Sequence, residues 1–327
     1  MAKKEVDGEG LNIPNRIKAL PVKRPGPIVA AVIVVLLAAM LIQGLITNPR
    51  LDWPTVWKYL FNENVLEGIR YTLELTVISM VVAIILSVIL AIMRKSINPV
   101  LRGVSWFFIW FFRGTPVYTQ LIFWGLFAVL IPKISLGIPF TSVEFWSIDS
   151  NVVVTAFNAA WIGLALNEAA YLSEIVRAGL EAVDPGQTEA AKALGMNRTL
   201  IMRRIVLPQA MRIIIPPTGN ETIGMLKTTS LVTAVPFTLE LQFATNAIAN
   251  RIYKPIPLLL VACFWYLLIT SILMFVQSRL EAHFGKGFDA RPVGTKGKQT
   301  PLPGKTDGEP KDDVDKLNQT TFVGLNA

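Results

Sequence analysis

Charged and hydroxyl side chains inside long apolar segments are the residues of this sequence best suited to chemistry. A charge at bilayer depth costs roughly 2.5–3.5 kcal/mol on insertion scales, so such a side chain usually faces a cavity or a partner. A carboxylate accepts hydrogen bonds, whereas an ammonium or a hydroxyl donates them. These groups indicate a polar pathway or an assembly contact, and the candidates are Glu168, Tyr171, Glu221, Lys227 and Ser230.

The sequence lacks the residues that disulfide bonding, zinc binding or hydrolase catalysis would need. Cys263 is the only cysteine, which excludes a disulfide framework, and with the single histidine, His283, it leaves no Cys/His zinc cluster. One histidine also removes the usual general base of a serine or cysteine hydrolase. The sequence therefore predicts no catalytic residue, no metal site and no cofactor bound by this chain.

The elements that must position these side chains are membrane spans. Of the 327 residues, 52% are apolar and 17% charged, against roughly 25% charged in a soluble domain. A bilayer core about 30 Å thick needs about 20 apolar residues in a helix. We therefore expect an all-α integral membrane protein with six transmembrane helices. The candidate spans are Ile28–Thr47, Leu75–Met93, Gly114–Pro132, Ser150–Asn167 (continuing towards Arg177), a span Ala210–Phe237 expected to break at Pro216-Pro217, and Pro255–Ser278.

The basic residues favour one orientation. With the N-terminus inside, the inner segments 1–27, 94–103 and 177–212 hold 15 Lys and Arg, whereas the outer loops 48–69, 133–149 and 238–254 hold 5. Both termini are then cytoplasmic. The net charge of +8 is mostly topological, so we expect no nucleic-acid partner. We interpret the first span, Ile28–Thr47, as an uncleaved membrane anchor. Residues 285–327 are rich in Gly, Pro and Lys and are expected to form a disordered tail.

The longest inner segment, 184–208, combines two short helices with a turn. Asp184 is a plausible N-cap before Pro185, which suits a first helical turn. Gly195 permits the left-handed geometry that ends a helix, and a second, oblique helix is expected over 198–206. Pro208 is expected to set the bend into the next span. A helix of small residues can sit in a groove of a cytoplasmic partner, with Glu189 offering a carboxylate.

This segment resembles the EAA loop of bacterial ABC importer permeases. The pattern is Glu-Ala-Ala, three residues, Gly, nine residues, Ile-x-Leu-Pro, and its residues here are Glu189, Ala190, Ala191, Gly195, Ile205, Leu207 and Pro208. Further motifs are similar to the polar amino acid (histidine/glutamine/arginine) uptake family, namely Phe112–Pro116, Ala170–Arg177, Pro185–Gln187, Leu207–Ala210 and Lys227–Leu231. The likeness covers about 66–280; the extra helix 28–47 and the long tail depart from it.

The resemblance implies a type I (MetI-like) importer permease in a bacterial inner or plasma membrane. It implies a second permease subunit, identical or paralogous, two cytoplasmic ATPases docked on the EAA loops, and an extracytoplasmic binding protein that delivers a polar amino acid. ATP and Mg would bind the ATPases, since this chain has no Walker A motif and is not itself an enzyme. Membrane lipid is the remaining expected partner.

Within that family an amino acid zwitterion needs an acceptor for its ammonium and donors for its carboxylate. The sequence suggests Glu168 or Glu221 for the first role and Lys227 and Ser230 for the second. Alternatively, these charges pair with each other or across a subunit interface.

A second group of residues could form an inner gate. Arg113, Gly114, Thr115 and Pro116 shape that gate, or Arg113 extends to lipid phosphates. An ion-coupled secondary transporter is the alternative function, although no convincing internal repeat supports it.

Overall fold

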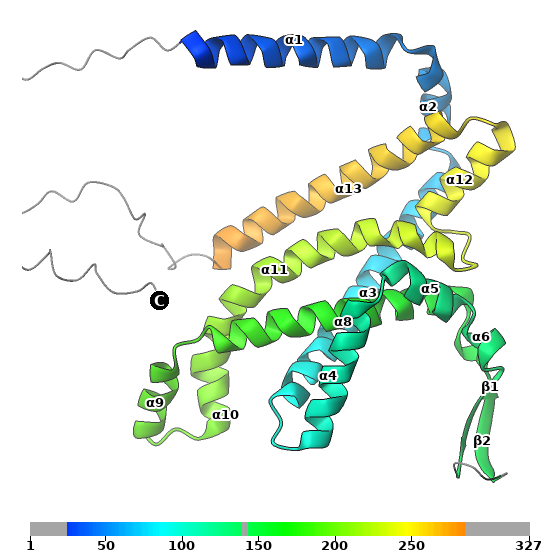
Figure 1. Cartoon of the computed structure of the whole chain (residues 1–327). Coiled ribbons are helices and arrows are strands. Elements are labelled where there is room, and N and C mark those ends of the chain that lie inside the picture. The colour runs from blue at the N-terminus through cyan, green and yellow to red at the C-terminus, as the bar shows by residue number, and fades with distance from the viewer. Residues whose placement is uncertain (1–24, 139–140, 142, 285–327) are drawn as a thin grey trace, which may run out of the picture. The chain divides into compact units, whose positions relative to one another are not determined.

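The structure is a computed structural model that describes residues 25–138, 141 and 143–284 (Figure 1). The basic segment 1–24 and the predicted disordered tail 285–327 lie outside the described residues. In chain order the elements are α1 (Pro25–Thr47), η1 (Pro49–Leu51), α2 (Trp53–Leu60), α3 (Glu63–Arg94), α4 (Pro99–Gly114), α5 (Val117–Gly125), α6 (Phe127–Leu130), β1 (Lys133–Gly137), β2 (Glu144–Asp149), α7 (Ser150–Val153), α8 (Ala156–Glu181), α9 (Pro185–Ala193), α10 (Arg198–Ile201), the π-helical turn η2 (Met202–Val206), α11 (Leu207–Thr228), the 3₁₀ helix η3 (Thr229–Ala234), α12 (Leu241–Ile252) and α13 (Pro255–Phe284).

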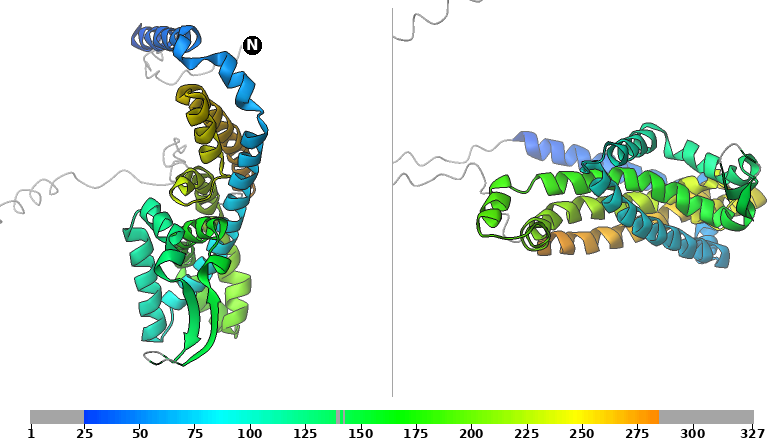
Figure 2. Two further views of the ribbon diagram at one scale, coloured as in Figure 1. Left: turned by 90° about the vertical axis from the view of Figure 1, so that its right-hand side faces the viewer. Right: turned by 90° about the horizontal axis from the view of Figure 1, so that it is seen from below.

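Four long helices form the centre of the protein. Helix α11 lies between α8 and α13, and α3 packs along α8 (Figures 1 and 2). Their main apolar core contains Leu75 of α3, Leu164 of α8 and Met225 of α11, all buried. A second core joins α2, α12 and α13 around Leu241 and Leu258. The fold therefore presents α8 and α11, which carry most of the predicted polar residues, side by side.

Among the described residues, three helices are long and apolar enough to cross a membrane, namely α1, α3 and α13. Helix α1 has a mean hydropathy of 2.8 and none of its apolar window is buried, so its whole circumference remains open to lipid or to another helix. The other predicted spans correspond to shorter or more polar helices, α4 with α5, α8, and α11. Helix α8, with 26 residues, is about 39 Å long, enough to span a bilayer core.

The predicted break at Pro216 and Pro217 is wrong. Helix α11 continues through both prolines and ends only at Thr228, where η3 begins. A proline in a helix removes a hydrogen bond, but neighbouring helices can satisfy the freed backbone groups. Gln277 of α13 contacts α11 at this point, because its side-chain amide donates to the Pro216 carbonyl at 3.3 Å and to Asn220 at 2.9 Å.

The chain does break at Gly114-Thr115-Pro116, as the sequence predicts. Helix α4 ends at Gly114, Thr115 is extended, and α5 begins at Val117. A residue before proline disfavours helical backbone angles, which accounts for the position of the break. The single span predicted over 114–132 is therefore two shorter helices, α5 and α6, which follow the break at the end of α4.

A β-hairpin interrupts the expected all-α fold. Strands β1 and β2 pair antiparallel in the loop predicted to lie outside, with Lys133 opposite Asp149 and Ile134 opposite Ile148. The alternation of polar and apolar residues in Lys-Ile-Ser-Leu over 133–136 is typical of a short strand, and apolar length does not reveal it. The hairpin and the segment α9–α10 lie at opposite ends of the helical core (Figures 1 and 2).

Candidate coupling segment and polar pathway

The coupling segment begins as the sequence predicts. Asp184 is the N-cap of α9, and its carboxylate accepts a hydrogen bond from the Gly186 backbone N–H at 2.8 Å. Pro185 occupies the first turn, where its missing N–H costs no helical hydrogen bond. These features fix the start of α9 directly after α8.

Gly195 ends α9 in the left-handed conformation, with φ of +77°. Its N–H donates to the Lys192 carbonyl at 2.9 Å, and the Met196 N–H donates to the Ala191 carbonyl at 3.1 Å. This pair of bonds is the Schellman motif that satisfies the last carbonyls of a helix. The predicted glycine turn is confirmed.

The EAA residues have unequal exposure. Glu189 and Ala190 are exposed, whereas Ala191 is buried in a small core with Val206 and Ala210. Leu194, directly before the glycine, is 82% exposed. Leu194 is not among the predicted coupling residues, although a lone leucine at an otherwise polar helix end indicates a contact surface. Helix α9 thus anchors by one face and presents Glu189, Ala190 and Leu194 outward.

The second part of the segment runs directly into α11. Backbone angles stay helical from α10 through η2, so the predicted separate helix over 198–206 is joined to the next span. Ile205 packs on the same small core, Leu207 begins α11, and Pro208 occupies its first turn. The direction changes between α10 and α11 (Figure 1), where a π turn and a proline follow one another, both common causes of kinks.

Ion pairs brace the end of α8 just before this segment. Arg177 contacts Glu174 at 2.6 Å and Glu181 at 2.7 Å. Lys95, which follows α3, lies 3.8 Å from Glu181. The end of α3 is therefore tied to the end of α8, next to α9.

Glu168 is the most unusual group of the polar pathway. It is 7% exposed, and its Oε1 has no hydrogen-bond partner. The carboxylate of Glu221 on α11 is close enough to interact with it electrostatically. Among the described residues, neither carboxylate forms an ion pair with Lys227 or with any other cation. Within the part of the chain that the structure describes, these charges therefore do not pair with each other.

Tyr171 lies on a more open side of α8 than Glu168. Its ring is 38% exposed and carries the guanidinium of Arg113 at 5.3 Å from the ring centroid. This cation–π contact directs Arg113 towards the middle of α8. The structure thus joins one predicted gate residue to one predicted pathway residue.

Lys227 and Ser230 line a groove that neither Glu168 nor Glu221 lines. This open groove measures about 490 Å³ and is also lined by Gln242, Tyr266 and Thr270. The Ser230 hydroxyl donates to the Lys227 carbonyl at 2.8 Å, so its proton is used within the chain. Lys227 and Ser230 are the two residues predicted to donate hydrogen bonds to the carboxylate of the substrate. Of these two, only Lys227 has its polar group directed at open space.

Two amide side chains that are not among the predicted site residues stabilise the break between α4 and α5. The buried Gln120 donates to the carbonyls of Phe112 and Thr115, each at 3.0 Å. Asn167, next to Glu168, donates to the same Phe112 carbonyl at 2.9 Å and to Gln120 at 3.2 Å. The carbonyls freed at Gly114 are therefore satisfied by side chains, one of which adjoins the pathway.

The carboxylate of Glu240 is also absent from the predicted site residues, because 238–254 is predicted as an outer loop. It is fully buried as the N-cap of α12. Its oxygens accept hydrogen bonds from Thr72 at 2.9 Å, from the Gln242 N–H at 2.7 Å and from the Tyr266 hydroxyl. Since those donors belong to α3, α12 and α13, Glu240 joins three helices.

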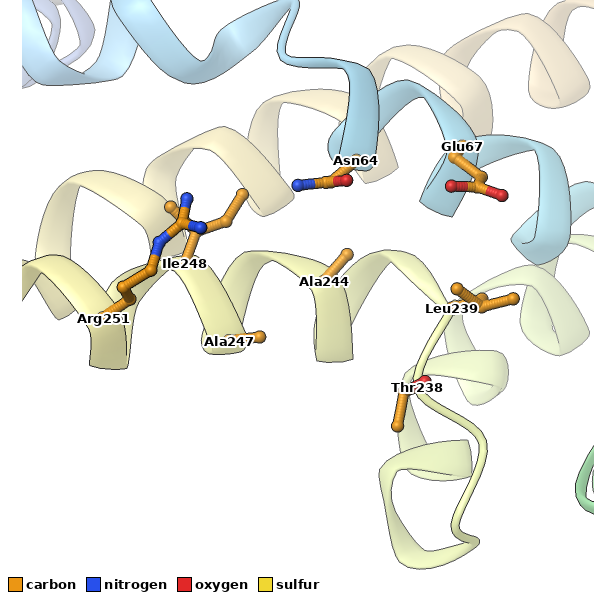
Figure 3. A pocket seen from close by; sticks show the side chains of 8 residues that line it. All are labelled: Asn64, Glu67, Thr238, Leu239, Ala244, Ala247, Ile248 and Arg251. Carbon is orange, nitrogen blue, oxygen red and sulfur yellow. The ribbon is translucent and has the colours of Figure 1, made fainter.

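A pocket of about 270 Å³ lies between the start of α3 and α12 (Figure 3). Asn64 and Glu67 border it from α3, and Arg251 approaches from the end of α12. Nearby, Lys254 contacts Asp52 at 2.6 Å, and this hydrogen bond lowers the pKa of the Asp52 carboxyl. Charged groups of both signs therefore gather at this end of the bundle.

Comparison with known proteins assigns the class. Residues 83–286 match the family model described as binding-protein-dependent transport system inner membrane component. The match spans most of the helical core and includes α8, the coupling segment and α11. The chain belongs to this family and is a multi-pass ABC transporter permease. Because the chain belongs to this family, the alternative function of an ion-coupled secondary transporter no longer applies.

Relatives of known description narrow the comparison. The chain is 52% identical over 274 residues to the arginine transport system permease protein ArgU of Corynebacterium glutamicum, covering 84% of this chain and 85% of that protein. It is 35% identical to the nopaline transport system permease protein NocM of Agrobacterium fabrum, covering 66% and 84%. A crystal structure of an amino acid ABC transporter with histidines matches with a TM-score of 0.56 and 31% identity, over 68% of this chain and 95% of that one.

Proposed function

We propose that this chain is the permease subunit of an ATP-driven importer for a polar amino acid with a cationic side chain, arginine or a close analogue. The relatives named above transport amino acids or their derivatives according to their descriptions, and the most similar of these is an arginine permease. The physical support comes from two pathway carboxylates, Glu168 and Glu221, which form no ion pair with any cation among the described residues.

One observation carries this substrate class. Glu168 is buried with an unsatisfied oxygen, and a second carboxylate, Glu221, lies near it without a paired cation. Leaving buried polar atoms without partners costs free energy, so such a group indicates a ligand or partner that supplies donors. A guanidinium offers five donors in a planar fork that matches carboxylates. The Arg113–Tyr171 pair and Lys227 then remain for the carboxylate of the substrate.

The partners follow from the same proposal. Two cytoplasmic ATPases, which bind ATP and Mg, dock on α9 of this permease and of a second permease subunit. An extracytoplasmic binding protein delivers substrate at the opposite end, and both termini face the cytoplasm. When the ATPases close, α9 moves with them, and its direct continuity with α8 and α11 transmits the motion to the pathway. A ligand that prefers one state thereby shifts the equilibrium between inward and outward access.

Glu168→Gln tests the substrate class. It keeps the size of the side chain and removes its charge, so we expect arginine uptake to fall about tenfold or more, the effect of losing about 1.4 kcal/mol of binding. Glutamine uptake should change less. The measurement is uptake of each amino acid into proteoliposomes containing the complete transporter, with Glu144→Gln in the exposed hairpin as the matched control. Normal arginine uptake by Glu168→Gln in a fully assembled complex would remove Glu168 from the pathway.

Gly195 offers a sharp test of coupling. A Cβ at Gly195 would meet no atom within 4 Å, so a substitution there acts through the positive φ and not through a clash. Asparagine tolerates this conformation, whereas a β-branched residue does not. We expect Gly195→Val to lose substrate-stimulated ATP hydrolysis and Gly195→Asn to retain most of it, with equal amounts of both variants in the membrane. Equal stimulation in the two variants would contradict the coupling role.

A further inference from the structure

The turn between α3 and α4 forms a basic groove that the transport function does not use. The groove measures about 450 Å³ and is lined by Arg94, Pro99, Arg102, Gly103 and Trp106. No acidic side chain lines it. The spacing of its two arginines is fixed, because Ser105 of α4 donates a hydrogen bond to the Leu90 carbonyl of α3 at 2.8 Å.

Both arginines keep their charge available. Neither Arg94 nor Arg102 forms an ion pair with any residue that the structure describes, whereas the adjacent Lys95 pairs with Glu181. Two guanidinium groups around one open groove attract an anion, and their planar donors match phosphate oxygens. The groove therefore fits a phosphate group.

The surroundings of the groove identify what carries that phosphate. Trp106 is 51% exposed and its ring stacks on Trp110 one turn further along α4. Leu101, Val104 and Phe107 are also exposed, so an apolar surface leads away from the arginines along α4. Tryptophan rings favour the boundary between headgroups and acyl chains, and basic pockets between membrane helices bind anionic headgroups. A soluble anion would gain nothing from this apolar surface.

We propose that the α3–α4 groove is a binding site for a phospholipid with a net negative headgroup, with Arg94 and Arg102 on its phosphate and Trp106 beside its glycerol and upper acyl chains. The tie between Lys95 and Glu181 sets this site next to the end of α8, which leads directly into α9. A bound lipid thus holds the α3–α4 turn against the membrane surface beside the coupling segment.

Native mass spectrometry of the purified full-length chain tests the site. The protein is titrated with phosphatidylglycerol or with phosphatidylcholine of the same acyl chains. We expect phosphatidylglycerol to bind more tightly. We expect the double variant Arg94→Gln, Arg102→Gln to weaken its binding about twentyfold, since each basic residue near a membrane surface contributes about a fivefold effect. Arg279→Gln is the control, because Arg279 is exposed, unpaired among the described residues and outside the groove.

A second pair of variants blocks the groove without removing charge. A Cβ at Gly103 meets no atom within 4 Å, so Gly103→Leu fills open space, and Gly44→Leu in α1 adds the same bulk elsewhere. We expect only Gly103→Leu to weaken phosphatidylglycerol binding.

Three results would overturn the proposal. The first is equal affinity for both lipids. The second is unchanged phosphatidylglycerol binding in the arginine and Gly103 variants. The third is loss of phosphatidylglycerol binding when inorganic phosphate is added at a concentration close to that of the lipid, because it would show that the groove recognises free phosphate and not the lipid.

Discussion

At the scale of single residues, two buried carboxylates illustrate different fates of a charge inside a membrane protein. Glu240 accepts hydrogen bonds from three neighbouring elements, whereas Glu168 leaves an oxygen without a donor. A satisfied buried network rigidifies a structure, and an unsatisfied group indicates a missing ligand. These observations support a structural role for Glu240 and are the basis of the transport role that we propose for Glu168.

Variants at Glu240 and Tyr266 separate these roles. Glu240→Ala leaves the donors of Thr72, Tyr266 and Gln242 buried without an acceptor, so we expect a loss of roughly 3–5 kcal/mol in the free energy of unfolding. Tyr266→Phe removes one donor and should cost about 1.5–3 kcal/mol.

Chemical denaturation in detergent measures both. Tyr118→Phe is the control, since Tyr118 is exposed and its hydroxyl has no described partner. A Glu240→Ala protein as stable as the parent would disprove the structural role.

At the scale of elements, the break between α4 and α5 is stabilised by side chains and not by the backbone alone. Gln120 and Asn167 supply the donors that the carbonyls of Phe112 and Thr115 need. Because Asn167 stands next to Glu168, the geometry of this break is coupled to the polar pathway.

Gln120→Leu should destabilise this break. Removing the amide leaves the Thr115 carbonyl without a donor and takes one acceptor from Asn167, while the Phe112 carbonyl keeps its bond from Asn167, so we expect a cost of about 1–3 kcal/mol in the free energy of unfolding. Thr119→Val, at the neighbouring exposed position, should cost little. Denaturation curves of the two variants give the comparison, and equal stability would show that water replaces the amide.

At the scale of the whole molecule, the mechanism depends on which elements lie at each end of the helical core. Segment α9–α10 and the β-hairpin lie at opposite ends of the core, so an ATPase on α9 and a binding protein at the other end can act on one pathway at once (Figure 1). Exposed marker positions exist at both ends, because Glu189 lies on α9 and Tyr253, at the end of α12, is 90% exposed.

Labelling of single cysteines tests this orientation. In a Cys263→Ala background, we expect a membrane-impermeant thiol reagent to label Tyr253→Cys in intact cells and to label Glu189→Cys only after the membrane is opened. The positive-inside distribution of Lys and Arg is the physical reason. Labelling of Glu189→Cys in intact cells would reverse the topology and remove the docking role of α9.

Local chemistry explains why much of the coupling segment was predictable from sequence. An N-cap, a proline and a left-handed glycine act within a few residues of one another, so Asp184, Pro185 and Gly195 adopt the structures that their sequence predicts. Apolar length likewise identified α1, α3 and α13 as spans. The hairpin escaped prediction because its strands are short. The continuity of α11 escaped prediction because packing against α8 and α13 overrides the local preference of Pro216 and Pro217 against a helix.

The sequence by itself determined the membrane class, the family motifs and the caps of α9, because composition and local backbone preference need no distant contact. Only the tertiary structure decided which polar groups meet. It placed Lys227 in a groove that Glu168 does not line, joined Arg113 to Tyr171 and buried Glu240 among three helices. Such pairings depend on how helices pack around one another, and helical spacing alone leaves that packing open.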